Sequence, residues 1–162
     1  MQWDKITDII LISSIAILGV FALCGLIEWI RRKSLKKVDL ELLAMVPSLV
    51  LMASTYFIFD KIFILNTRQD GSGEASFPST HTMVVATIFL MAFVALPKYI
   101  KNKALLVILD IVMLALIALV SVGRVAANKH WLSDVIGGLV FALIFAVVYY
   151  VIIKLVRRKQ HE

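Results

Sequence analysis

The chain has 162 residues, of which 61% are hydrophobic, and its mean hydropathy is +0.94. A soluble domain is nearer half apolar, so this composition excludes an ordinary soluble protein and predicts an integral membrane protein of one domain over residues 1–162. The formal net charge of +6 does not indicate nucleic-acid binding, because most basic residues form short runs beside apolar segments. We therefore expect no nucleic-acid partner.

Five apolar stretches are long enough, or nearly so, to cross a bilayer as helices, which takes about 20 residues each. Helices are expected because a lone segment in lipid must satisfy its own backbone hydrogen bonds. The sequence therefore predicts an all-α, polytopic membrane bundle of about five transmembrane helices. The stretches are Ile9–Ile30, Leu40–Leu65, Ser79–Leu96, Ala104–Val122 and Val135–Ile153.

The basic residues are divided unevenly between the two sides of the membrane. The positive-inside rule makes the side richer in Lys and Arg cytoplasmic, which puts the N-terminus outside and the C-terminus inside a multi-pass protein of the plasma or inner membrane. Twelve of the 17 basic residues fall on that side: Arg31, Arg32, Lys33, Lys36, Lys37, Lys98, Lys101, Lys103, Lys154, Arg157, Arg158 and Lys159. The outer side has the other five, which orientation does not require: Lys5, Lys61, Arg68, Arg124 and Lys129.

A polar string, Pro78-Ser79-Thr80-His81, begins the third apolar stretch on the outer side. Ser is a strong N-cap residue, and the free backbone N–H groups of a first helical turn bind anions such as phosphate. A plain capped membrane helix would explain Ser79 and Thr80 alone. His81, in contrast, is an awkward cap and is well placed to give a proton to a molecule bound at the helix end.

A second polar pair, His130 and Asp134, stands four residues apart where the fifth stretch begins. Residues at this spacing share one face of a helix. An aspartate bonded to one imidazole nitrogen fixes the tautomer and leaves the other nitrogen free as a nucleophile or base. The alternative is an interfacial His–Asp pair that only stabilises the helix start. A carboxylate there also interacts favourably with the positive end of the helix dipole.

Three outer cations, Lys61, Arg68 and Arg124, form a candidate clamp for a phosphate group. Arg suits planar bidentate contacts with phosphate, and Lys acts as a point charge. Snorkelling at the interface is the alternative, to which Lys61 is well suited. Two histidines and an aspartate can also ligate zinc, but three cations around one divalent ion oppose it, so we expect no metal.

Together these clusters resemble the type 2 phosphatidic acid phosphatase family, of the acid phosphatase/vanadium haloperoxidase superfamily. The resemblance covers about residues 61–134, and the apolar helices beyond are generic. The residues that carry it, in the order and spacing of the three family motifs, are Lys61 and Arg68, then Pro78, Ser79 and His81, then Arg124, His130 and Asp134.

The chain departs from the family pattern at three positions. Gln69 replaces a Pro, Thr80 replaces a Gly beside the phosphate, and Gly123 replaces a Ser, which removes one hydroxyl contact. The family commonly has six membrane helices, whereas five are predicted here. None of these changes touches a residue that must carry a proton or a bond.

The resemblance implies a metal-independent lipid phosphatase that needs no cofactor and whose active site is extracytoplasmic. It implies that His130 attacks phosphorus to form a phosphohistidine, that Asp134 supports His130, and that His81 protonates the leaving oxygen and then activates water. A polyprenyl diphosphate such as undecaprenyl diphosphate is the favoured substrate, and phosphatidylglycerophosphate and phosphatidic acid are the alternatives. The implied phosphate-binding residues are Lys61, Arg68, Ser79, Thr80 and Arg124.

Two other classes of protein compete with this interpretation. One is a non-catalytic membrane scaffold that binds anionic lipid, against which the two histidines and Asp134 argue. The other is a vanadate-dependent oxidase of the same superfamily, which the five apolar stretches and the absence of a soluble helical bundle oppose. The sequence leaves a homodimer open. Asp110, inside the fourth stretch, has no place in the predicted site, and we expect it to contact a neighbouring helix or subunit.

Overall fold

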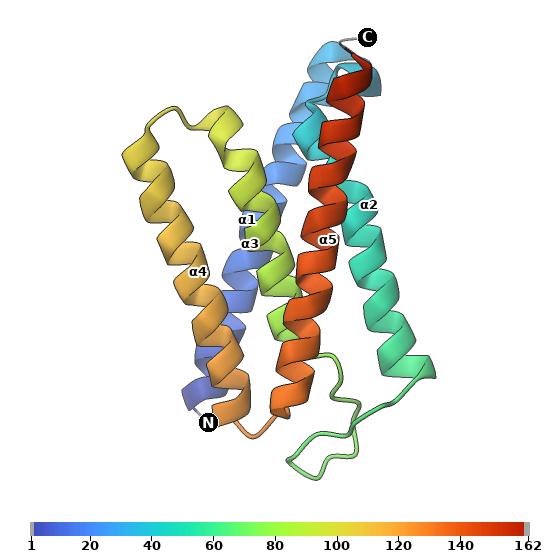
Figure 1. Ribbon diagram of the computed structural model, residues 1–162, viewed down its shortest axis with the longest axis vertical. Coiled ribbons are helices and arrows are strands. Elements are labelled where there is room, and N and C mark those ends of the chain that lie inside the picture. Colours follow the sequence, from blue (N-terminus) through green and yellow to red (C-terminus); the bar gives the residue numbers. More distant parts are fainter. Residues whose placement is uncertain (1, 161–162) are drawn as a thin grey trace.

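The computed structural model describes residues 2–160 as a bundle of five long helices (Figure 1). All five are long and apolar enough to cross a membrane, so the predicted number of spans is confirmed. Short 3₁₀ and π turns, Leu35–Lys37 and Ile58–Ile62, lie between α1 and α2 and after α2. The long helices are α1 (Gln2–Arg32), α2 (Leu40–Phe57), α3 (Thr80–Tyr99), α4 (Lys103–Ala126) and α5 (Leu132–Lys159).

Two of the predicted boundaries were wrong in ways that matter for the site. Helix α1 begins at Gln2 instead of Ile9, helped by Asp4 in its first turn and by the Thr7 hydroxyl, which donates to the Trp3 and Asp4 carbonyls. Helix α2 ends at Phe57 and widens into the π turn, so residues 63–65 belong to a loop and not to a helix. Both corrections bring polar residues to the same end of the bundle.

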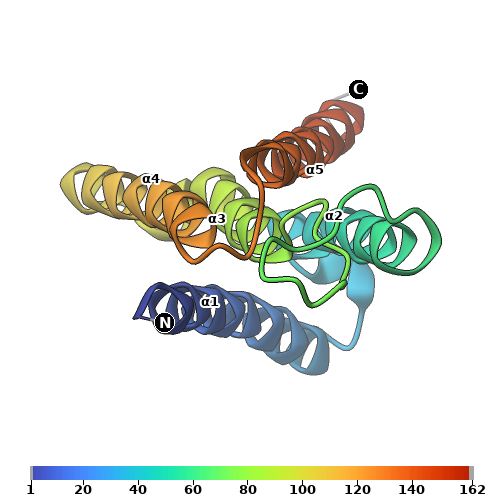
Figure 2. The ribbon, with the colours of Figure 1, turned by 90° about the horizontal axis from the view of Figure 1, so that it is seen from below.

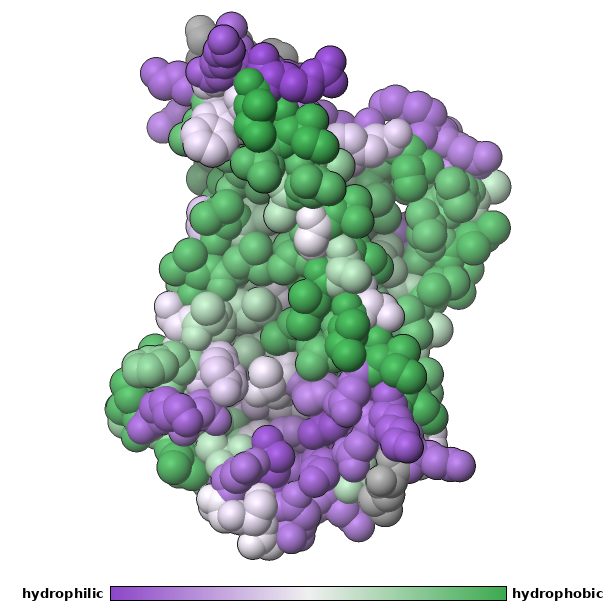
Figure 3. All heavy atoms as spheres, turned by 180° about the vertical axis from the view of Figure 1, so that it is seen from behind, coloured by the Kyte–Doolittle hydropathy of each residue, from purple (hydrophilic) through white to green (hydrophobic). Residues whose placement is uncertain are grey.

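On the face seen in Figure 3, a band of apolar side chains lies between two polar ends. Large aliphatic side chains on α1, α2, α4 and α5 are exposed, including Ile12, Val50, Ile111 and Leu143. Such exposure would be unfavourable in water but is expected for surfaces that face hydrocarbon. The chain is therefore a multi-pass membrane protein.

Helix α3 lies at the centre of the bundle and packs against all four other long helices (Figure 2). Its side chains Met83, Ile88 and Phe89 are fully buried, and Ala86 and Ala92 lie between them. Small residues let membrane helices approach closely, because packing rather than hydrophobicity holds them together in lipid. This central position means that the first turn of α3 is held by several helices at once.

A buried carboxylate ties the helices together at the end where the C-terminus lies. Glu41 of α2 accepts from Lys98 of α3 at 2.5 Å and also pairs with Arg157 of α5. The Tyr149 hydroxyl donates to the Glu41 carbonyl at 3.1 Å. A buried charge is tolerated only when it is paired in this way, so the network fixes how α2, α3 and α5 meet.

At the opposite end, Gly138 of α5 allows close contact with the first turn of α3. A Cβ atom at this position would lie 2.9 Å from the Ser79 carbonyl oxygen and 3.2 Å from the Met83 nitrogen. Both are backbone atoms that cannot move aside. The absence of a side chain therefore sets the distance between the two helices that flank the candidate site.

We predict that Gly138→Ala destabilises the protein by about 1–3 kcal/mol, because overpacking must push α5 away from α3. The matched control is Gly19→Ala on α1, where a Cβ meets nothing within 4 Å. Thermal unfolding in detergent measures both variants against the parent chain. Equal stability of the two variants would contradict this account of the α3–α5 contact.

Candidate active site

The loop between α2 and α3 folds back over the end of the bundle. The Ser76 N–H donates to the Asn66 carbonyl at 2.9 Å, and Thr67 and Ala75 form an isolated antiparallel bridge. Gly71 and Gly73 have φ angles of 77° and 74°, a region that glycine enters without strain. The chain can therefore reverse direction within a few residues.

This loop is fastened to the segment that leads into α5, around the buried carboxylate of Asp134. Asp134 accepts from Asn66 at 2.7 Å, and its backbone carbonyl accepts from the Ser79 N–H at 2.9 Å. The Trp131 indole donates to the Thr67 carbonyl at 3.0 Å. The two loops, which the sequence placed on one face, are thus in direct contact.

His130 lies in the segment before α5, not in its first turn as the sequence suggested, because the helix begins at Leu132. Its side chain is almost completely buried. The Nδ1 atom is 2.9 Å from the Ser76 carbonyl oxygen, which can only accept, so Nδ1 carries the proton. The Nε2 atom consequently carries the lone pair, as a nucleophile requires.

Asp134 does not make the predicted hydrogen bond to His130. The distance from His130 Nδ1 to Asp134 Oδ2 is 3.7 Å, longer than a hydrogen bond, although the negative charge remains close. Asp134 Oδ2 instead accepts from the Trp131 backbone N–H at 2.9 Å and caps α5. The tautomer of His130 is therefore set by the Ser76 carbonyl, while Asp134 supports it through charge and through the loop.

Burial and the nearby positive charge of Arg124 lower the pKa of His130 to about 4. The Arg124 carbonyl also accepts from the His130 backbone N–H at 3.3 Å, which places the imidazole beside the end of α4. At neutral pH the side chain is uncharged. An uncharged imidazole with Nε2 free of its proton is the reactive form of this residue.

His81 lies in the first turn of α3 and contacts an acid that the sequence did not connect with it. Its Nε2 atom is 2.8 Å from Asp8 Oδ1 of α1. The expectation that the first helix began at Ile9 left Asp8 outside it. Asp4 and Asp8, four residues apart before an apolar run, were the signal that this helix brings carboxylates to the site.

Arg124, in the last turn of α4, is buried against the start of α1. Its NH1 group is 3.3 Å from Thr7 Oγ1 and 3.4 Å from Asp4 Oδ1. A Cβ atom on Gly123 would lie 2.6 Å from Thr7 Cγ2, so the glycine that replaces the family serine makes room for Thr7. A hydroxyl of α1, and not one at position 123, thus contacts Arg124.

The other predicted phosphate ligands are brought together only in part. Arg68 pairs with Glu74 at 2.8 Å and lines the cavity described below, as does Thr80. Ser79 is fully buried, and its hydroxyl is 3.2 Å from that of Thr82. Lys61 is exposed, pairs with Asp60 at 2.7 Å and does not line the cavity.

A cavity of about 230 Å³ joins the two histidines with an arginine. Within residues 2–160, Arg68 Nε and Arg124 Nε are buried donors without a hydrogen-bond partner. Buried polar groups are normally paired, so these donors suit an oxyanion; Arg68 lines the cavity, whereas Arg124 does not. In the same range, no three acidic, His or Cys side chains are grouped so that they could hold a metal. The lining residues are Leu11, Tyr56, Asp60, Arg68, Ala75, Thr80, His81 and His130.

The fold and the cavity together define an integral-membrane helical bundle with a polar site at one end. The chain belongs to the PAP2 superfamily, whose family model matches residues 53–158. This membership confirms the resemblance found from the motifs. Members of the superfamily are phosphatases, so the chain is assigned to the membrane lipid phosphatases.

The fold is also similar to a solved structure, described as the first transmembrane PAP2 type phosphatidylglycerolphosphate phosphatase from Bacillus subtilis. The TM-score is 0.59 and the sequence identity is 20%, over 96% of this chain and 75% of that one. No curated protein sequence matches the chain. The structural similarity confirms the all-helical membrane fold.

We predict that the His130 imidazole titrates near pH 4 and not near its ordinary value of 6.5. The folded protein binds this proton more weakly than the unfolded chain. The contribution of His130 to the free energy of unfolding is therefore fully present above about pH 6.5 and is lost as the pH falls towards 4. NMR of ¹⁵N-labelled imidazoles measures the titration. The Arg124→Gln substitution should raise the pKa of His130, because it removes the nearby positive charge. A pKa near 6.5 for His130 in the parent chain would contradict the prediction.

Proposed function

We propose that the protein hydrolyses a phosphate or diphosphate ester of a membrane lipid in two steps at the cavity. The observation that carries this proposal is that His81 and His130 line the same cavity as Arg68. One neutral imidazole with a free lone pair and a second imidazole beside a carboxylate are the two groups that nucleophilic and acid–base chemistry at phosphorus needs.

In the first step, Nε2 of His130 attacks phosphorus, the N–P bond forms and the bond from phosphorus to the lipid oxygen breaks. That oxygen takes a proton from His81, which leaves the lipid as an alcohol or a monophosphate. The Ser76 carbonyl holds the proton on Nδ1 of His130 and accepts more strongly as positive charge develops on the ring. The product of this step is a phosphohistidine.

In the second step, His81 accepts a proton from water while the water oxygen attacks phosphorus. The N–P bond breaks, phosphate leaves, and His130 returns to its neutral form. His81 thus acts first as an acid and then as a base, as microscopic reversibility requires. Asp8 beside His81 stabilises the protonated ring that is present before the first step and is restored by the second.

The phosphoryl oxygens are proposed to bind Arg68 and Arg124 with the first turn of α3 at Ser79 and Thr80. Both arginines now contact carboxylates, Glu74 and Asp4, so an incoming phosphate exchanges one anion for another and needs no unpaired cation beforehand. Lys61, exposed at the rim, is proposed to attract the anionic head group from solution. The proposed chemistry uses no metal.

A polyprenyl diphosphate such as undecaprenyl diphosphate is the substrate that we propose, at the extracytoplasmic face. The support is the charge distribution, because 12 of the 17 basic residues lie at the other end of the bundle and mark it as cytoplasmic. Phosphatidylglycerophosphate, which the matching bacterial phosphatase has in its description, and phosphatidic acid are the alternatives.

The test is phosphate release from these three lipids by the parent chain and by His130→Ala in detergent. Activity of the variant should fall by at least about a thousandfold on every lipid, since the nucleophile is lost. The parent chain should prefer the polyprenyl diphosphate, and a chelator should leave its rate unchanged. Retained activity of a folded variant would overturn the mechanism, and a preference for another lipid would overturn only the substrate.

We also predict that Asp8→Asn lowers kcat by about tenfold with little change in KM, because the amide keeps the shape but loses the charge beside His81. The alkaline limb of the pH–rate profile should move to lower pH, which a purely structural role would not cause. Asp110→Asn, on the part of α4 away from the cavity, is the matched acid-to-amide control. In the described residues Asp110 has no hydrogen bond or ion pair.

A further inference from the structure

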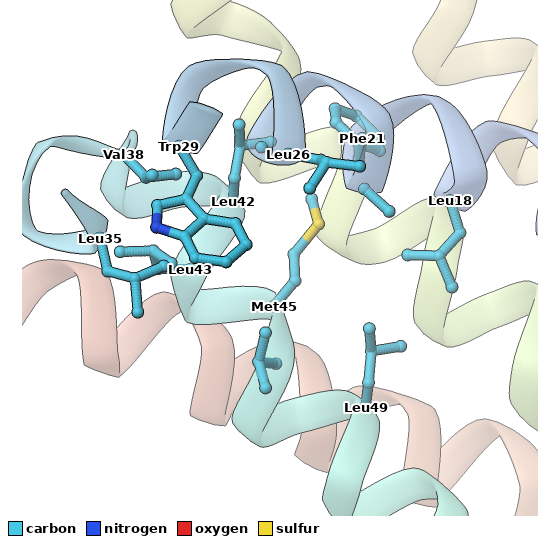
Figure 4. A pocket seen from close by; sticks show the side chains of 13 residues that line it. Leu18, Phe21, Leu26, Trp29, Leu35, Val38, Leu42, Leu43, Met45 and Leu49 are labelled. Atoms are coloured by element: carbon cyan, nitrogen blue, oxygen red, sulfur yellow. The ribbon is translucent and has the colours of Figure 1, made fainter. Parts of the chain in front are cut away.

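An apolar groove runs between α1 and α2 in the half of the bundle away from the active-site cavity (Figure 4). Its volume is about 270 Å³, and every one of the 13 residues that line it is apolar. Leu18 and Leu49 lie at one end, Met45 lies along the groove, and Trp29 and Leu35 lie at the other. From Leu18 to Trp29 the groove extends for about 16 Å, at 1.5 Å per residue.

The second end of the groove meets the turn between α1 and α2, which carries five cations. Arg32 pairs with Glu28 at 3.8 Å and with Asp39 at 3.9 Å. Among the residues that the structure describes, the other four have exposed side chains with no carboxylate partner: Arg31, Lys33, Lys36 and Lys37. Four unpaired positive charges therefore stand at the mouth of a wholly apolar groove.

The active-site end of the molecule is arranged differently. Four of its five cations contact a carboxylate of the chain, namely Lys61, Arg68, Arg124 and Lys129, and within residues 2–160 only Lys5 of the five does not. That end neutralises most of its own charge, whereas the turn between α1 and α2 leaves most of its charge open to an external anion. The positive charge of the basic turn is therefore not neutralised by carboxylates of the chain.

We propose that this groove binds one acyl chain of an anionic phospholipid, whose phosphate head group contacts the basic turn. The groove opens in the apolar band that faces hydrocarbon, so an acyl chain is the apolar partner present there. The cations at its mouth complement a negative head group at the membrane surface. The groove is separate from the catalytic cavity, and its occupancy does not depend on the reaction proposed there.

Trp29, which lines the groove, reports on its occupant. The chain is reconstituted in phosphatidylcholine vesicles with a small fraction of either phosphatidylglycerol or phosphatidylcholine that carries brominated acyl chains. Subtracting the Trp29→Phe variant isolates the quenching of Trp29 from that of Trp3 and Trp131. We expect the brominated anionic lipid to quench Trp29 at a several-fold lower mole fraction than the brominated zwitterionic lipid.

Two matched pairs of variants separate this site from general lipid contact. Gly25→Leu fills the groove, because its Cβ would lie 3.6 Å from Leu42 Cβ, whereas Gly19→Leu on the same helix meets nothing. Each cation removed by Lys36→Gln or Lys37→Gln should reduce the preference by about fivefold, the factor expected from a juxtamembrane charge. Lys101→Gln and Lys103→Gln, in the turn before α4, should leave it unchanged.

Equal quenching by the two lipids would overturn the proposal. So would a preference that Gly25→Leu and the Lys36 and Lys37 variants leave intact, or one that the Lys101 and Lys103 variants reduce equally. Protection of Trp29 from both lipids would show that a protein surface, such as a second copy of the chain, covers the groove. None of these readouts uses phosphatase activity, so their failure is distinct from failure of the proposed reaction.

Discussion

The site depends on one buried carboxylate, that of Asp134, which holds together two loops from opposite parts of the chain. It caps α5 through the Trp131 N–H and accepts from Asn66, while its carbonyl receives the Ser79 N–H at the start of α3. A buried carboxylate must have such partners, because its desolvation is otherwise too costly. Asp134 therefore positions the α2–α3 loop and the segment that carries His130 through its carboxylate, and the start of α3 through its backbone carbonyl.

Helix α1 adds the second constraint, because it supplies negative charge to a cluster of cations at the end of a membrane bundle. Asp8 contacts His81, and Asp4 and Thr7 contact Arg124. Without these groups, a buried guanidinium would be poorly compensated in a medium of low dielectric constant. The carboxylates thus neutralise the cations of the site, and in the proposed reaction the phosphate would replace them as the partners of the arginines.

The two ends of the bundle manage charge in opposite ways. At the active-site end four of the five cations meet internal carboxylates. At the other end a buried Glu41 joins α2, α3 and α5, while Arg31, Lys33, Lys36 and Lys37 at the turn between α1 and α2 have no carboxylate partner among the described residues. An enzyme that binds an anionic head group gains selectivity when that group must replace a carboxylate at the arginines. A membrane anchor benefits from an end that attracts anionic lipid without a fixed geometry.

The sequence by itself determined the five membrane spans and the family, and it predicted which residues are reactive, because long apolar runs and motif spacing are local properties. The tertiary structure alone decided that Ser76 holds His130, that Asp8 contacts His81, and that Lys61 stands outside the cavity. The partner of His130 is a backbone carbonyl, which no side-chain pattern marks. Asp8 is far from His81 in sequence, and only packing of α1 against α3 brings their side chains together.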